Sequence, residues 1–167
     1  VDSGVTHLSF SLHTMSSATW KRLMAAKLAV SYEQCIEWVK YSAKRIGLVT
    51  RVNVAYGSDA EDADELINWA ENVLGVQEMT LIEMIPANAY AREHARRLPC
   101  EEEMESWGFA FVGGQPWGLR VYRRCDDRNR GGISVATCGF GRQDPSFVDQ
   151  SKNLELILSG PVAGQKG

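Results

Sequence analysis

Three strand-like runs in the first half of the chain constrain the fold more than any other feature. They lie at 6–13, 48–55 and 79–85; the first two alternate polar and apolar residues, while the third is mostly apolar and is followed by Pro86. Strands of this kind that are separated by amphipathic helices form parallel sheets of right-handed βαβ units. The pattern therefore predicts an α/β fold with a parallel sheet.

The residues between the runs have helical periodicity. We expect helices at 18–28 and 31–46 between the first two runs, and at 60–74 between the second and the third. Gly47 and Gly75 are expected to end the last two helices, because glycine readily takes the left-handed conformation that follows a helix.

The pattern changes in the carboxyl-terminal third. Short helices are expected at 88–97 and 99–107, and a loop at 113–116. Two short strands at 118–125 and 133–138 are joined by a polar turn, so they predict a β-hairpin appended to the sheet. One further short element is expected in the tail, at 154–158.

The composition is that of an ordinary globular domain. Of the 167 residues, 44% are hydrophobic and 23% are charged, values that exclude disordered, collagen-like and coiled-coil classes. No apolar run approaches the roughly 18 residues that cross a bilayer, and the first residues do not have the pattern of a signal peptide. We therefore expect a cytoplasmic protein without a membrane partner. Because a strand begins at Thr6 with no leader before it, we also expect a fragment of a longer protein.

Six arginines gather in the carboxyl-terminal part, although the formal net charge is −3. They are Arg120, Arg123, Arg124, Arg128, Arg130 and Arg142. Such a patch can recognise phosphate through bidentate contacts, or it can form a solvated face of the hairpin. Residues 120–124 place charge on both faces of the predicted strand, which favours a solvated, exposed edge.

Ligands of parallel sheets gather at the carboxyl ends of the strands. This rule selects candidate binding residues, namely Ser9, Ser11, His13, Arg51, Asn53, Glu83, Met84 and Asn88. Polar side chains repeated on one inward face need a ligand, water or each other as partners. The alternative is that they bond the backbone at the rim, and periodicity does not separate the two. His13 could act as a general base, since its ordinary pKa lies near neutrality, but no carboxylate partner is visible nearby.

The three runs also resemble a known family. Residues 4–13 read Gly-Val-Thr-His-Leu-Ser-Phe-Ser-Leu-His, which resembles the fourth barrel strand of radical S-adenosylmethionine enzymes. Residues 51–54 are similar to the fifth strand, and 79–86 to the sixth strand of the molybdenum-cofactor branch. The resemblance covers residues 4–98. It implies a partial (β/α) barrel of parallel strands at 1–112, and a carboxyl-terminal extension with the β-hairpin at 113–167.

The resemblance further implies that the strand ends bind S-adenosylmethionine. Ser11 would contact its amino-acid portion, Asn53 or Arg51 would face its ribose or carboxylate, and the backbone near Met84 and Ile85 would lie against its adenine. The complete set expected to bind the cofactor is Ser9, Ser11, His13, Arg51, Asn53, Glu83, Met84 and Ile85.

Members of that family bind a [4Fe-4S] cluster with a Cys-x-x-x-Cys-x-x-Cys loop, which this sequence lacks. If the loop lies upstream, S-adenosylmethionine and the cluster would supply a 5′-deoxyadenosyl radical that abstracts a substrate hydrogen. Relatives in the molybdenum-cofactor branch use carboxyl-terminal cysteines for a second cluster. Cys125 and Cys138, with Cys100 as a conceivable third ligand, are therefore candidate metal ligands; the alternative is that they are inert thiols.

We therefore expect part of a radical S-adenosylmethionine enzyme that modifies a small molecule, a peptide or a nucleotide. Its partner would be the missing half of the barrel or another subunit, because a half barrel leaves the first strand with an unpaired edge. Two alternatives stay open. One is a non-catalytic α/β binding module for a ligand such as a phosphorylated molecule, and the other is a degenerate partner subunit that has lost its cluster.

Overall fold

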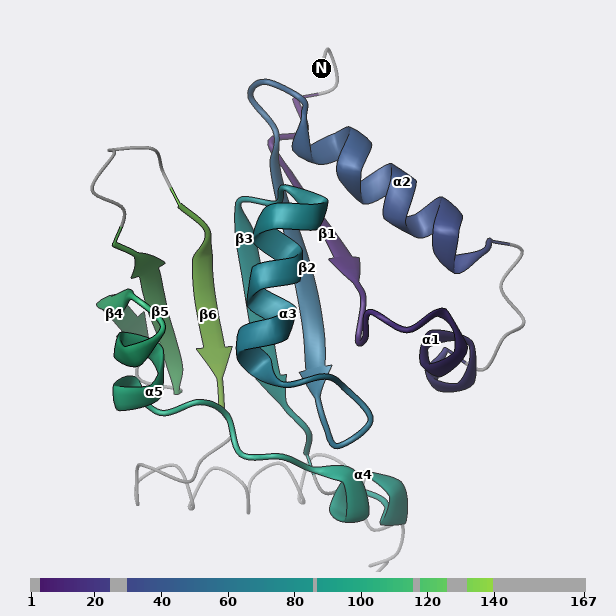
Figure 1. The fold of residues 1–167 in the computed structure, drawn as a ribbon, viewed down its shortest axis with the longest axis vertical. Helices are drawn as coiled ribbons and strands as arrows, with labels where there is room; N and C mark the ends of the chain where they lie inside the picture. Colours follow the sequence, from purple (N-terminus) through teal and green to yellow (C-terminus); the bar gives the residue numbers. More distant parts are fainter. Residues whose placement is uncertain (1–3, 25–29, 86, 116–117, 126–131, 140–167) are drawn as a thin grey trace, which may run out of the picture.

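The computed structural model describes residues 4–24, 30–85, 87–115, 118–125 and 132–139 (Figure 1). They form one mixed sheet of six strands in the order β1-β2-β3-β6-β5-β4. The strands are β1 (His7–Ser11), β2 (Val49–Tyr56), β3 (Glu78–Glu83), β4 (Phe109–Gln115), β5 (Leu119–Arg124) and β6 (Ser134–Cys138). β1, β2, β3 and β6 are parallel, whereas β5 pairs antiparallel with both β6 and β4. The predicted α/β class is confirmed, but the sheet is only partly parallel.

Helices connect the strands and cover one face of the sheet. They are α1 (Ser17–Leu23), α2 (Tyr32–Ala43), α3 (Ala63–Trp69), which continues into a π-helical turn η1 (Ala70–Leu74), α4 (Ala89–His94) and α5 (Glu101–Ser106). In Figure 1, α2, α3 and α5 lie in front of the sheet. Ser31 and Gln34 form a reciprocal capping box at the start of α2. Gly75, with φ of 72°, ends η1 as expected. None of the described helices is both long and apolar enough to cross a membrane.

The core lies between the sheet and these helices. Alternate residues of the central strands, such as Val52, Val54 and Leu81, are completely buried on the face that meets α3. Leu66 and Ile67 of α3 are buried against them. Burial of each such side chain contributes about 1.5–3 kcal/mol, so this face supplies most of the stability.

The other face of the sheet has no described helix over it. Its residues on β2 and β3 are half-exposed, and they alternate with buried ones along all of β2 and along β3 as far as Ile82. We call it the open face and define it by the side chains that the strand registers align there: Ser9, Ser11, Arg51, Asn53, Glu78, Thr80, Arg123 and Ser134.

The predicted loop at 113–116 is wrong over its described residues, because 113–115 belong to β4. Gly113 and Gly114 hide this strand from pattern recognition, and a register shift between Phe111 and Gly113 breaks its alternation. β4 covers the outer side of β5, so β5 is not the exposed edge that its charges suggested, and Tyr122 is only 1% exposed. The expected boundary between the partial barrel at 1–112 and the extension at 113–167 falls within β4. This strand belongs to the same sheet as the other five described strands.

Two of the clustered arginines form ion pairs rather than a solvated patch. Arg120 pairs with Glu101 at 3.1 Å, and the Nε of Arg124 lies 2.7 Å from Glu71. Arg123 is exposed on the open face. Arg128, Arg130, Arg142 and the expected element at 154–158 lie outside the described residues.

Candidate functional site

The strand registers bring the predicted polar residues of β1 and β2 together. Ser9 is aligned with Arg51, and Ser11 with Asn53, on the open face. The next strand continues both rows, with Glu78 beside Arg51 and Thr80 beside Asn53. Because neighbouring strands lie about 4.8 Å apart, each row across β1, β2 and β3 spans roughly 10 Å.

The row of Ser11, Asn53 and Thr80 lacks internal partners. None of these three side chains hydrogen-bonds another described residue, although Asn53 and Thr80 are half-buried. Half-buried amides and hydroxyls normally find a hydrogen-bond partner, in the protein or outside it. This row therefore presents donors and acceptors that remain available to a bound molecule.

Sequence patterns missed Thr80, although it lies in a predicted strand. Alternation within 79–85 groups it with Ile82, but only the register of β3 against β2 shows that this side of β3 continues the Asn53 row. The missing signal was the pairing of the strands.

The neighbouring row already contains a balanced charge pair. The guanidinium of Arg51 donates to Oε2 of Glu78, from Nε at 2.8 Å and from Nη2 at 2.5 Å. Both side chains remain partly exposed. Two of the five N–H donors of Arg51 are therefore taken by Glu78, and a ligand carboxylate would use the remaining donors, such as those of Nη1, beside an existing negative charge. The sequence did not indicate this pair.

His13 lies just beyond β1, and β2 holds its ring. The backbone N–H of Ala55 donates to Nδ1 of His13 at 3.0 Å, so in the neutral ring the proton must be on Nε2. Burial lowers the pKa of His13, which keeps the ring neutral. Nδ1 is thus occupied, and any exchange of protons with a ligand would have to use Nε2.

The predicted residues at the end of β3 are arranged differently from one another. The side chain of Met84 packs against the backbone of Gly57. A β-carbon added to Gly57 would lie only 2.5 Å from Sδ of Met84. Ile85 is 53% exposed. Glu83 lies close enough to Cys138 to raise the pKa of that thiol, although burial is the larger cause. Asn88 caps α4 by accepting from the N–H of Ala91.

The structure does not bring the candidate metal ligands together. Cys138 ends β6 opposite Leu119, whereas Cys125 follows Arg124 at the other end of the same strand pair. Cys138 is opposite Leu119, which lies six residues before Cys125. The two cysteines are therefore about 20 Å apart along the strands, so they cannot both bind one metal ion at Zn–S distances of about 2.3 Å. Cys100 caps α5. Across the described ranges, no three His, Cys, Asp or Glu side chains are grouped as metal ligands.

A polar cluster that sequence patterns missed lies beyond the carboxyl end of β2. Asp59 accepts hydrogen bonds from Arg22 and from the hydroxyl of Tyr90, and these bonds lower the pKa of its carboxyl group. The ring of His94 contacts Ser58 at 2.8 Å. The cluster joins α1 and α4 to the loop after β2, and it is assembled from segments too distant in the sequence to show a local motif.

Comparison with protein-family models, with curated proteins and with solved structures found no match for this chain.

Proposed function

We propose that this chain is the carboxyl-terminal part of the barrel of a radical S-adenosylmethionine enzyme, and that its open face binds S-adenosylmethionine. The observation that carries the proposal is the unpartnered row of Ser11, Asn53 and Thr80 across three neighbouring parallel strands. Two of the three were expected to bind the cofactor from the resemblance, and the third extends the same row.

The residues of the open face fit the polar groups of this cofactor. Hydroxyl and amide groups both donate and accept hydrogen bonds, as ribose hydroxyls and an amino acid require. Ile85, exposed at the end of β3, offers an apolar surface of the kind that adenine needs. In that family, the cofactor and a reduced [4Fe-4S] cluster supply a radical that abstracts hydrogen from the substrate. The described cysteines do not form a cluster site, so we assign the cluster to a segment that adjoins β1.

The edge of β1 supports the proposed neighbour. β1 is at one end of the strand order, and most of its side chains are exposed on both faces, including the apolar Leu8 at 37%. Parallel strands are ordinarily buried on both faces and paired on both edges. A further strand from the same enzyme or from a second subunit would complete these contacts and place its residues beside Ser9 and Ser11.

Titration of the isotope-labelled chain with S-adenosylmethionine, followed by amide NMR shifts, tests the proposal. We expect saturable shifts at Ser11, Asn53 and Thr80, with a dissociation constant in the millimolar range, because only part of the site is present. Asn53→Ala should weaken binding about tenfold through loss of one hydrogen-bonding group, whereas Ser106→Ala on α5 should leave it unchanged. Absence of shifts on the open face at millimolar cofactor would refute the proposal.

One observation favours a second candidate, a non-catalytic module that binds a phosphorylated ligand. Arg123 on the open face has no ion pair with another described residue. Phosphate is a preferred ligand of an available guanidinium. If inorganic phosphate shifts the amides around Arg123 while S-adenosylmethionine shifts none, this second function replaces the first.

A further inference from the structure

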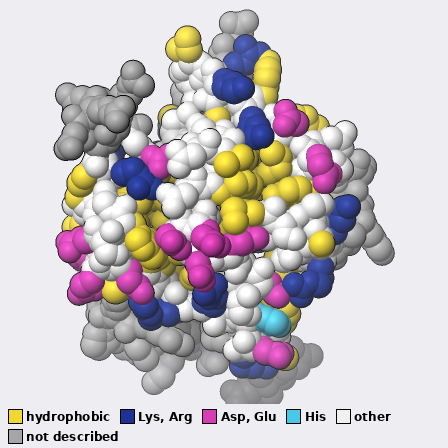
Figure 2. Space-filling view, in the orientation of Figure 1, with side chains coloured by type: hydrophobic (Ala, Val, Ile, Leu, Met, Phe, Trp, Pro, Cys, Tyr) yellow, Lys and Arg dark blue, Asp and Glu magenta, His cyan; other side chains and the backbone are white. Residues whose placement is uncertain are grey.

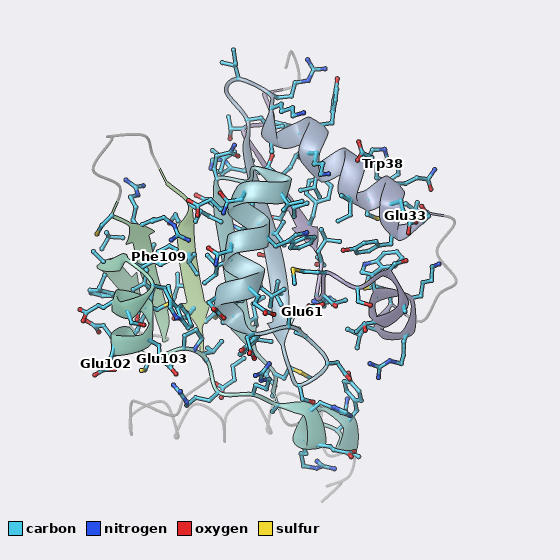
Figure 3. All side chains as sticks on the ribbon, in the orientation of Figure 1. Glu33, Trp38, Glu61, Glu102, Glu103 and Phe109 are labelled. Carbon is cyan, nitrogen blue, oxygen red and sulfur yellow. The ribbon has the colours of Figure 1, made fainter. Side chains whose placement is uncertain are left out.

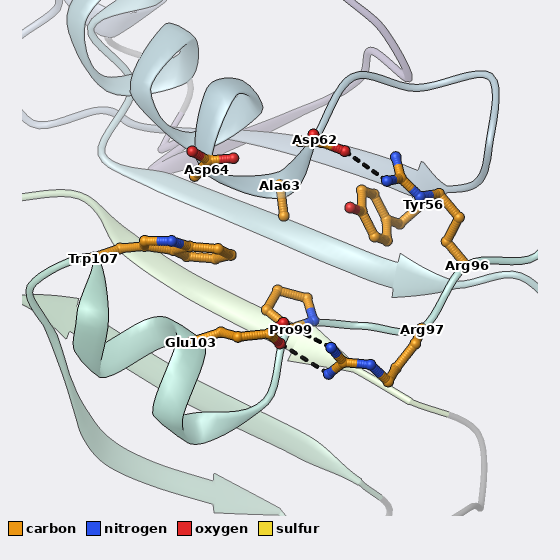
Figure 4. Close-up of a pocket in the computed structure, with 9 residues that line it drawn as sticks. All are labelled: Tyr56, Asp62, Ala63, Asp64, Arg96, Arg97, Pro99, Glu103 and Trp107. Atoms are coloured by element: carbon orange, nitrogen blue, oxygen red, sulfur yellow. Dashed lines mark hydrogen bonds and ion pairs between the residues drawn. The ribbon is translucent and has the colours of Figure 1, made fainter.

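A cleft of about 390 Å³ opens on the opposite side of the sheet from the open face. The end of β2, the start of α3, the segment before α5, α5 itself and the residue after it form its walls (Figure 4). Its lining residues are Tyr56, Asp62, Ala63, Asp64, Arg96, Arg97, Pro99, Glu103 and Trp107. Its volume lies within the range of small-molecule sites, about 300–1,000 Å³.

Both arginines of the cleft are already paired. Arg96 donates to Asp62 at 2.5 Å and stacks on the ring of Tyr56, 5.1 Å from its centroid. Arg97 donates to both carboxylate oxygens of Glu103, at 2.8 and 2.7 Å. These pairs, drawn as dashed lines in Figure 4, leave little positive charge for an anionic ligand.

The third carboxylate of the cleft is unpaired. Asp64 makes no hydrogen bond or ion pair with another described residue, although its side chain is half-buried. Two guanidiniums and three carboxylates line the cleft, so it carries one net negative charge. Figure 2 also shows acidic side chains gathered at the lower end of α3 and over α5, where the field attracts cations.

Trp107 supplies a flat aromatic surface at the same end of the cleft as Asp64 (Figure 4). Two hydrogen bonds hold the backbone of Trp107 in place. Its backbone N–H donates to the carbonyl of Glu103 at 3.2 Å, and its backbone carbonyl accepts from the guanidinium of Arg124 at 3.2 Å. A planar guanidinium stacks well on an indole face and can donate two hydrogen bonds to one carboxylate.

We propose that this cleft binds a guanidinium group, which stacks on Trp107 and pairs with Asp64. The group belongs either to a small arginine-like molecule or to an arginine side chain on another protein. The inference is independent of the proposed function, because it concerns the other side of the sheet.

The experiment compares two guanidinium probes with a neutral analogue on the full chain. The probes are acetyl-arginine amide and the peptide acetyl-Gly-Arg-Gly amide, and the analogue is the same peptide with citrulline, which keeps the shape but lacks the charge. We expect saturable NMR shifts at Asp64 and at the Trp107 indole with the arginine probes, at millimolar affinity, and at least tenfold weaker binding of the citrulline peptide.

Asp64→Asn should weaken binding of the arginine peptide about tenfold. The matched control is Glu65→Gln, in the same first turn of α3 but outside the cleft, which should leave the affinity unchanged. Both carboxylates lie in the first turn of α3, near the positive end of the helix dipole, so the pair separates ligand binding from the effect on helix stability. Equal affinity for acetyl-arginine amide and for the arginine peptide indicates a small-molecule ligand. Much tighter binding of the arginine peptide indicates a protein partner. Equal binding of the citrulline peptide, unchanged affinity in Asp64→Asn, or no binding at all would overturn the proposal.

Discussion

Nδ1 of His13 accepts a hydrogen bond from the backbone N–H of Ala55 at 3.0 Å, so a side chain continues the ladder between β1 and β2 beyond its last backbone bond. Protonation of Nδ1 would remove this acceptor. Burial lowers the pKa of His13 below its ordinary value of 6.5. The unfolded chain therefore binds this proton more readily than the folded protein does.

It follows that His13 should make the protein less stable in mild acid. The contribution is complete above pH 6.5 and is lost as the pH falls from there through the lowered folded-state pKa. His13→Gln keeps an acceptor but does not titrate, so its urea midpoint should fall less between pH 7.5 and pH 5 than that of the wild type. Parallel pH profiles of the two proteins would contradict this role of His13.

Glu103 should titrate far below an ordinary glutamate. Hydrogen bonds from Arg97 and from the backbone N–H of Cys100 lower its pKa to about 2. Its contribution to stability is therefore present above pH 4.5 and is lost as the pH falls through 2. Carboxyl carbon NMR should show this titration, and Arg97→Met should move the pKa of Glu103 back toward its ordinary value. The pKa of Glu102, its neighbour on α5 (Figure 3), is also lowered, mainly by the Cys100 side chain, and it should not move in Arg97→Met.

Gly57→Ala should destabilise the protein by about 1–3 kcal/mol, as overpacking does. An added β-carbon would lie 2.5 Å from Sδ of Met84 and 3.0 Å from the carbonyl oxygen of His94. The matched control is Gly113→Ala, where no atom lies within 4 Å, and its unfolding free energy should change by less than about 0.5 kcal/mol. Urea denaturation measures both. Equal stabilities would mean that the backbone at Gly57 moves freely away from Met84.

Glu71→Ala should cost about 2–3 kcal/mol. Its carboxylate lies 2.7 Å from Nε of Arg124 and accepts from the N–H of Ile133, so it links η1 to β5 and to the start of β6. Removal of one partner leaves a charge with little access to water. In contrast, Glu37→Ala removes an exposed pair with Lys40 at 3.9 Å, so it should change stability by less than about 0.5 kcal/mol. A small effect at Glu71 would show that solvent replaces the pair.

Glu61 should position the segment after β1. Its two carboxylate oxygens accept from the hydroxyl of Thr14 at 2.9 Å and from the N–H of Met15 at 3.0 Å. Figure 3 shows Glu61 beside the start of α3, next to that segment. Thr14 is fully buried, and its hydroxyl oxygen also accepts from the N–H of Ser16. Glu61→Ala leaves the hydroxyl proton without an acceptor and should cost about 1–3 kcal/mol. Faster amide hydrogen exchange at Met15 in this variant would confirm the link, and unchanged exchange would argue against it.

The sequence by itself determined the local elements of the first half and the faces of their side chains. Alternation in β2 assigned Arg51 and Asn53 to the face opposite Val52 and Val54, as the structure confirms. Such features depend on the period-two geometry of a strand and on residues that are neighbours along the chain. The same local rule ended η1 at Gly75.

Only the tertiary structure decided how these elements combine. The row from Ser11 through Asn53 to Thr80 exists because of strand register, and the separation of Cys125 from Cys138 follows from the pairing of β5 with β6. β4 was missed because its glycines have no side-chain pattern. The cleft beside Trp107 joins segments about fifty residues apart. Strand register and long-range packing depend on how much apolar surface distant segments bury against one another. The periodicity of a single segment does not contain this information.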